Sequence, residues 1–458
     1  MIPGGRDPAA APEVDLIPVR EGERILAVDV LRGCALFGIL WMNIVAFALP
    51  RAAYADPTVA GGAAGANRLF WLVSQIVFEG KMRTIFSMLF GAGVILLTSR
   101  AEERGAGAAD VYYRRTLWLV AFGLAHAYFI WSGDILYGYG VAGLVLYPFR
   151  RQSPRFLIVA GLLVLAVLAP KYVAEARHVE SLRAEAAAAT GAAAAGKSLT
   201  DAQREALFQW KEKLKEMKPP AAEVRKEIAD HQAGYGRLFM RRMEDVSGDQ
   251  SKGFYRFGFF DVAGMMLIGM GLLKLGVFAA ARSRAVYVRM ALAGYGVGVP
   301  LTWYLARRDA ATSFDPAGIL LDYSGYDVSR LAVAVGHIGV VMLLCRSGAL
   351  PSLTSRLAAV GRMALTNYLA TSIVCVLLFE GFGFGLFGRL QRVQLLYVVL
   401  PIWIAQAIAS PLWLRRFRFG PMEWVWRSLT YWRRQPMLRL RGAAEPGPGA
   451  VLDPAAPA

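Results

Sequence analysis

Long apolar runs are the feature that most constrains how this chain of 458 residues folds. Several runs of roughly 17 to 25 residues contain few charged side chains, and a helix of that length crosses the hydrocarbon core of a bilayer. A water-soluble core does not require runs of that length. The sequence therefore predicts an all-α fold, a polytopic transmembrane helix bundle with one long hydrophilic helical insert.

The apolar runs predict about ten membrane spans. A further segment, Asn67–Phe78, is apolar but brief, and it predicts an interfacial or re-entrant helix. The predicted spans are 25–49, 82–98, 116–131, 135–149, 156–169, 257–278, 285–305, 328–345, 363–379 and 394–414.

Arginine residues gather in alternate short loops, and this pattern predicts the orientation of the bundle. The basic loops are 100–115, 150–155 and 282–284, whereas the loop 132–134 has no basic residue. Because loops rich in Lys and Arg face the cytoplasm, we expect both termini to be cytoplasmic and the protein to lie in the cell inner (plasma) membrane. The same bias explains the net charge of +17, so we expect the lipid bilayer and no nucleic acid as a partner.

Charge and composition divide the chain into six segments. In the insert, Thr200 and Gln203 predict a capping box at the start of a helix. For this helix there are three alternatives: it covers the mouth of the bundle, it lies on the lipid surface, or it is a solvated spacer. Trp and Arg near the C-terminus favour an interfacial anchor, with a specific partner site as the alternative. The segments are 1–24 (disordered cytoplasmic N-terminus), 25–170 (N-terminal transmembrane bundle), 171–256 (extracytoplasmic helical insert), 257–414 (C-terminal transmembrane bundle), 415–440 (cytoplasmic interfacial helix) and 441–458 (disordered tail).

Ionisable side chains inside predicted spans are the candidate functional residues, because each costs about 2.5–3.5 kcal/mol to insert. In the first span Asp29 and Arg32 are one turn apart and can pair, and Asn43 returns to nearly the same face. The pair either fixes the helix near the headgroups or binds a ligand. Arg32 is the better binding candidate, since a guanidinium group holds phosphate with two hydrogen bonds.

Two of the four histidines lie in predicted spans. His126 precedes Asp134 at the outer end of the third span, where an imidazole and a carboxylate can serve as general base and orienting partner. The alternative for His126 is a hydrogen bond to a neighbouring helix. His337 is the second candidate and also fits packing or a relay. Lys81 and Asn367 complete the set of candidate substrate-binding residues.

The three cysteines show no CxxC or histidine-paired spacing, so we expect neither a disulfide framework nor a metal site. We also expect no bound cofactor.

Four stretches of the chain resemble the YeiB-like family of DUF418-domain membrane proteins of unknown function. They cover the first two spans and the C-terminal region, and together they extend over almost the whole chain. The stretches are RILAVDVLRGCALFGILWMN at 24–43, FEGKMRTIFSMLFGAG at 78–93, GRMALTNYLATS at 361–372 and RRFRFGPMEWVWRSLTYW at 415–432.

The opening Asp29, Arg32 and Gly33 is also similar to the start of the lysosomal heparan glucosaminide acetyltransferases and other integral-membrane acyltransferases. This resemblance implies transfer of an acyl group from a cytoplasmic thioester donor, such as acyl-CoA, to an acceptor on the outer face. The acceptor would be a small molecule or an envelope glycan. Those acetyltransferases carry a histidine between their first two spans, where this sequence has none, so His126 is assigned by its position and chemistry.

The leading hypothesis is therefore a membrane acyltransferase. In it Arg32 holds the phosphates of the donor, His126 is the base, Asp134 orients the imidazole, and Asn43 or Lys81 stabilises the oxyanion. The alternative is a secondary transporter or permease in which the buried charges relay ions or protons. A third hypothesis is a non-catalytic scaffold for envelope biogenesis. The oligomeric state stays open.

Overall fold

The computed structural model describes residues 25–103 and 107–439. The described residues form helices and no β-strand, with one isolated antiparallel bridge between Phe417 and Leu438. The predicted all-α fold is confirmed for this part of the chain. The predicted disordered segments 1–24 and 441–458 lie outside the described residues.

The α-helices match the predicted apolar runs in order and approximate position. Their bounds are α1 Leu26–Ala48, α2 Gly65–Val73, α3 Lys81–Glu103, α4 Ala108–Phe129, α5 Leu136–Leu146, α6 Pro154–Ala166, α7 Leu168–Ala194, α8 Asp201–Met217, α9 Ala221–His231, α10 Tyr235–Gly248, α11 Phe259–Lys274, α12 Arg284–Ala311, α13 Pro316–Ser347, α14 Pro351–Arg362, α15 Ala364–Phe379, α16 Leu396–Arg416 and α17 Pro421–Tyr431.

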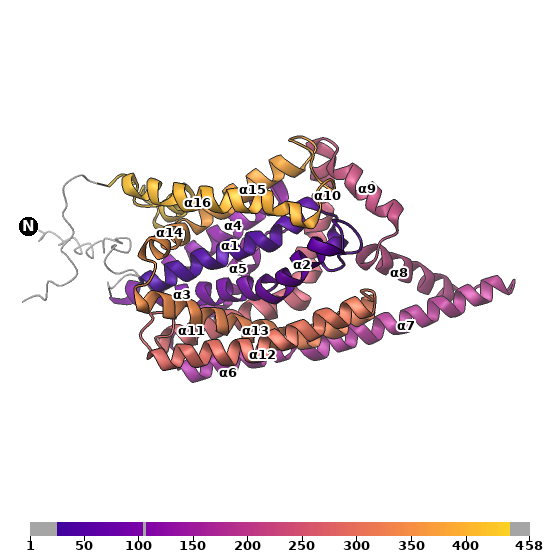
Figure 1. Cartoon of the computed structure of the whole chain (residues 1–458), viewed down its shortest axis with the longest axis horizontal. Coiled ribbons are helices and arrows are strands. Elements are labelled where there is room, and N and C mark those ends of the chain that lie inside the picture. Colours follow the sequence, from indigo (N-terminus) through magenta and orange to yellow (C-terminus); the bar gives the residue numbers. More distant parts are fainter. Residues whose placement is uncertain (1–24, 104–106, 440–458) are drawn as a thin grey trace, which may run out of the picture.

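Most of the helices run side by side along the longest axis of the molecule (Figure 1). The chain enters α1 at one end, where α14 also lies, and we call this the terminal end. Helices α8, α9 and α10 lie at the opposite end, which we call the insert end. The hydrophilic insert and the first turn of α1 are therefore at opposite ends of the bundle.

Fewer helices qualify as membrane spans than the sequence predicted. Among the described residues, six helical stretches qualify by length and apolar composition, and the bent pair α14 and α15 would be a seventh. The expected ten spans are not confirmed, because α4, α5 and α12 fall short. Helix α5 has 11 residues, α4 begins with charged turns, and glycine, proline and aromatic residues lower the mean hydropathy of α12.

The insert is attached to the bundle by unbroken helical stretches. Helices α6 and α7 form one stretch of 41 residues, Pro154–Ala194, and α10 and α11 join through a π-helical segment into the 40-residue stretch Tyr235–Lys274. The predicted insert boundaries at 171 and 256 fall inside these stretches. The expected capping box is present, because Thr200 Oγ1 accepts a hydrogen bond from Gln203 N and the Gln203 side chain accepts one from Thr200 N.

Helix α1 is largely buried and lies close to α14. A Cβ added to Gly33 would lie 2.1 Å from the Leu357 carbonyl oxygen, and one added to Gly361 would lie 2.0 Å from the Asp29 carbonyl oxygen. Such distances are below van der Waals contact. The two glycines therefore allow the backbones of α1 and α14 to touch, which is how small residues bring membrane helices together.

We expect Gly33→Ala to lower the free energy of unfolding by about 1–3 kcal/mol, since the added methyl group overpacks this contact. Thermal unfolding of the detergent-purified protein would measure the effect. Gly296→Ala on α12 is the matched control, because a Cβ at Gly296 meets no atom within 4 Å and alanine favours a helix. Equal stability of the two variants would contradict the close contact.

Candidate functional site

The turn between α4 and α5 brings His126 and Asp134 together. His126 Nδ1 lies 2.8 Å from Asp134 Oδ2, and each side chain is 1% exposed. Tyr137 N donates to the other carboxylate oxygen, Asp134 Oδ1, over 2.8 Å. Helices α4 and α5 approach closely because Gly123 faces the Tyr137 backbone, where a Cβ would lie 2.1 Å from the Tyr137 nitrogen.

The second ring nitrogen of His126 is not used by the contact with Asp134. His126 Nε2 is buried and has no hydrogen-bond partner among the described residues. With Nδ1 held by Asp134, the carboxylate favours the tautomer that leaves Nε2 as an acceptor. The His126 ring also packs against Tyr368 of α15, with ring centroids 5.1 Å apart.

A cavity of about 280 Å³ lies at the terminal end of the bundle. Its deeper wall is largely apolar and includes Leu36, Phe86 and Leu119. Arg32 contributes to its polar part while its Nη1 pairs with Asp29 Oδ1 over 2.8 Å. Six arginines line the cavity: Arg32, Arg100, Arg115, Arg362, Arg418 and Arg427.

Helix α17 closes one side of this terminal-end cavity. Glu423 accepts hydrogen bonds from Leu365 N and Thr366 N, so it caps the start of α15 and holds α17 against the bundle. The Arg115 guanidinium lies 3.6 Å from the centre of the Trp426 ring. Burial lowers the pKa of Arg427 to about 10, and the neighbouring charge of Arg115 adds to this effect, so Arg427 remains cationic at neutral pH.

A second cavity, of about 620 Å³, lies toward the insert end and is lined by Asn43 and Asp134. Its wall contains a network of charged groups. Arg330 is 1% exposed, pairs with Asp261 and donates from Nε to Asp327 Oδ1 over 2.8 Å. Arg83 Nη2 lies 3.1 Å from Asp261 Oδ2. The network satisfies its buried charges with one another.

The walls of the two cavities share residues near the His126–Asp134 pair. Ile39 of α1 and Ile135 at the start of α5 line both cavities. Asp134 lines the insert-end cavity, whereas Tyr368, the ring partner of His126, lines the terminal-end cavity. The pair therefore lies beside the residues that the two cavities share, and the imidazole itself lines neither cavity.

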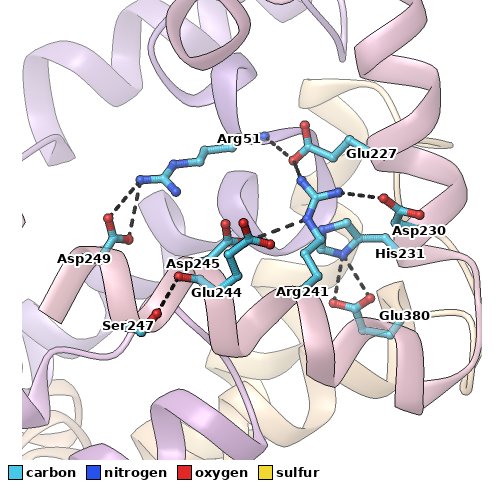
Figure 2. Close-up of polar contacts among 10 residues, drawn as sticks. All are labelled: Arg51, Glu227, Asp230, His231, Arg241, Glu244, Asp245, Ser247, Asp249 and Glu380. Atoms are coloured by element: carbon cyan, nitrogen blue, oxygen red, sulfur yellow. Dashed lines mark hydrogen bonds and ion pairs between the residues drawn. The ribbon is translucent and has the colours of Figure 1, made fainter. Parts of the chain in front are cut away.

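A third cavity, of about 460 Å³, lies between the insert and the bundle, and we call it the vestibule. Figure 2 shows the polar contacts that hold α9 and α10 around it. His231 Nδ1 lies 3.0 Å from Glu380 Oε2, and Arg51 Nη2 lies 3.2 Å from Asp249 Oδ1. Arg241 lies within 3.2 Å of Asp230 Oδ2 and contacts further carboxylates. These contacts fasten the insert to the end of the bundle.

Comparison with known proteins gives the family of the chain. The uncharacterized protein YeiB of Escherichia coli (strain K12) is 30% identical over 419 residues, which are 89% of this chain and 96% of YeiB. The chain belongs to the YeiB-like DUF418 family. The family model described as "Protein of unknown function (DUF418)" matches residues 272–433, a region that contains Arg330 and the whole of α17.

Another relative of this DUF418 protein, the uncharacterized protein YxaH of Bacillus subtilis (strain 168), is 27% identical over 449 residues, or 93% of this chain and 98% of YxaH. The uncharacterized 39.9 kDa protein in the amylase 3' region of Bacillus acidopullulyticus is 27% identical over 430 residues, or 92% and 98% of the two chains. No solved structure matches the chain. The resemblance predicted from the four sequence stretches is confirmed.

Three of the candidate residues in this DUF418 protein lie apart from His126. Lys81 is 1% exposed, and its Nζ donates to the Gln75 carbonyl oxygen over 2.6 Å, beside a separate cavity of about 70 Å³. Both ring nitrogens of His337 have partners, the Tyr295 hydroxyl at 2.7 Å and the Val77 carbonyl oxygen at 2.9 Å.

Asn367 likewise bridges helices, because its Nδ2 donates to the Val360 carbonyl oxygen and to Ser410 Oγ. These contacts give Asn367 a packing role, as the contacts of His337 do for that residue.

The sequence interpretation missed most of the arginines in the terminal-end cavity. It selected Arg32 alone, assigned Arg100 and Arg115 to a basic loop and Arg418 and Arg427 to the interfacial segment, and did not single out Arg362. Arg32, Arg115 and Arg418 come from segments far apart in the sequence, and the structure places them around one cavity. The available signal was that every one of these arginines was predicted on the same side of the membrane.

Proposed function

We propose that this DUF418 protein is a membrane acyltransferase that moves an acyl group from a thioester donor at the terminal end to an acceptor at the insert end. The observation that carries the proposal is that Ile39 and Ile135 line both cavities, beside the buried His126–Asp134 pair. Because basic loops face the cytoplasm, the terminal end is proposed to be cytoplasmic and the membrane to be the inner (plasma) membrane.

The terminal-end cavity suits a phosphorylated donor such as acyl-CoA. Six arginine side chains line it, and guanidinium groups bind phosphate oxygens through charge-assisted hydrogen bonds. The apolar wall beyond them offers a path for the pantetheine arm and the acyl chain. In this arrangement the nucleotide stays with the arginines while the thioester approaches Ile135 and Tyr368.

His126 would act as the general base. Its Nε2 accepts the proton of an acceptor hydroxyl or amine, and the acceptor oxygen or nitrogen then bonds to the acyl carbon. The bond between the acyl carbon and sulfur breaks, and the leaving thiolate takes the proton from the imidazolium. Asp134 stabilises the imidazolium between these steps. Asn43 is the candidate oxyanion donor, because Lys81 is committed to the Gln75 carbonyl.

Binding of the donor can be tested without knowing the acceptor. Acetyl-CoA or octanoyl-CoA at about 100 times its Kd should stabilise the purified protein by about 2.7 kcal/mol in thermal unfolding. Arg32→Ala and Arg418→Ala should weaken this effect, since both side chains line the cavity. Arg346→Ala is the matched control, because Arg346 is an exposed arginine of α13 outside the cavity wall. No stabilisation by either thioester would refute the donor site.

The second candidate function is a secondary transporter. It is favoured by the same pair of cavities at opposite ends of the bundle and by the buried Arg330–Asp261 network in the wall of one of them. Uptake of a solute by reconstituted vesicles in the absence of any acyl donor would support transport. Release of free CoA that depends on an acceptor would support acyl transfer.

A further inference from the structure

One charged side chain in the vestibule wall differs from its neighbours. Arg242 of α10 lines the vestibule and is 4% exposed. Its Nη1 atom is buried and has no hydrogen-bond partner in the described part of the chain. No carboxylate of the described residues forms an ion pair with it.

The other charged groups of the vestibule wall are paired. Each is within 4.0 Å of a group of opposite charge, or of a histidine and its carboxylate partner. The wall holds five carboxylates and three arginines, and Arg242 is the arginine among them without such a pair. The pairs are Arg51 with Asp249, Arg241 with Glu227 and Asp245, His231 with Glu380, and Glu216 with Lys213.

A guanidinium group removed from water without a partner is costly, and a bound anion would remove that cost. The planar group of Arg242 matches a carboxylate or a phosphate, each of which can accept two hydrogen bonds from it. We propose that the vestibule binds the anionic group of the acyl acceptor through Arg242, and that the acceptor is a small hydroxylated molecule carrying a carboxylate or a phosphate.

The position of the vestibule supports its assignment to the acceptor. Trp131, Ser132 and Gly133 line both the vestibule and the insert-end cavity, and Asp134 follows them directly in the chain. A molecule held by Arg242 therefore extends toward the His126–Asp134 pair. Paired carboxylates and the hydroxyls of Tyr54 and Tyr323 in the wall suit the hydroxyl groups of such a molecule. The acceptor role rests on the proposed function, whereas anion binding does not.

Three six-carbon polyols test the site in the detergent-purified full chain: neutral D-glucitol, D-gluconate and D-glucitol 6-phosphate. We expect an anionic polyol to raise the unfolding temperature in a saturable way and D-glucitol to have no effect. Arg242→Gln should weaken the apparent Kd by about 10- to 100-fold, the range expected when hydrogen bonds to a charged group are lost. A response to gluconate alone identifies a carboxylate site, and a response to the phosphate alone identifies a phosphate site.

Arg237→Gln is the matched control, because it removes the same charge from the same helix at a side chain that is 69% exposed. It should leave the apparent Kd unchanged. If Arg242→Gln does not fold, Arg242→Lys keeps the charge but loses the planar pair of donors, and it should also bind the anion more weakly. No response of the wild type to either anion, or an equal response in the Arg242 variants, overturns the proposal. Anion binding in a protein that fails to bind acyl-CoA refutes the acyltransferase function and leaves the anion site in place.

Discussion

Replacing His126 with alanine should lower the rate of acyl transfer by about 10²- to 10⁴-fold, the usual contribution of a general base. His126 Nε2 is buried without a partner, and its loss removes the proposed proton acceptor between the two cavities. Donor binding should persist, because His126 does not line the terminal-end cavity. The measurement is the release of free CoA thiol from acetyl-CoA in the presence of envelope extract.

The controls separate loss of the base from loss of the fold. His178→Ala removes an exposed histidine from α7 and should not change the rate. Asp134→Asn should also slow transfer, because the amide cannot stabilise the imidazolium. Stabilisation by acetyl-CoA, unchanged in His126→Ala, would show an intact donor site. A normal rate of CoA release in a folded His126→Ala protein contradicts the assignment of His126 as base.

Replacing Arg330 with methionine should lower the free energy of unfolding by about 3–5 kcal/mol, the range for breaking a buried ion pair from one side. Arg330 is 1% exposed and holds both Asp261 and Asp327. Its removal leaves these carboxylates in a buried site, with Arg83 as the remaining cation beside Asp261. Thermal unfolding in detergent, together with the yield of monodisperse protein, measures the effect.

Arg346→Met is the matched control for this prediction, since Arg346 lies on the same helix as Arg330 and is exposed. Adding Asp261→Asn to Arg330→Met should recover part of the lost stability, because it removes one of the uncompensated charges. If Arg330→Met unfolds at the same temperature as the wild type, the network in the insert-end cavity does not stabilise the bundle.

Local signals in the sequence predicted much of the fold. Apolar runs located the helices, and the short connection between α4 and α5 made contact between His126 and Asp134 foreseeable, because they are eight residues apart across one turn. The capping box at Thr200 was equally local. Each of these features depends on neighbouring residues, which a single sequence displays directly.

Features that depend on packing between distant segments could not be predicted. Arg100, Arg362 and Arg427 line one cavity only because α3 and α14 pack on α1 while α17 packs on α4 and α15. Ten spans are not confirmed, because α4, α5 and α12 do not combine the helix length and the hydropathy of the six stretches that qualify. Nothing in the sequence marks Arg242, because the lack of a hydrogen-bond partner for its Nη1 atom is visible only in the folded structure.

The 40-residue stretch Tyr235–Lys274 has a mechanical consequence. Arg242 and Asp261 both lie on this helical stretch, and at 1.5 Å per residue they are roughly 28 Å apart along its axis. The π-helical segment Asp249–Gly258 lies between them, and such segments are places where a helix can change its winding. The wall of the vestibule and the buried Asp261–Arg330 pair are therefore joined through the backbone of a single helical stretch.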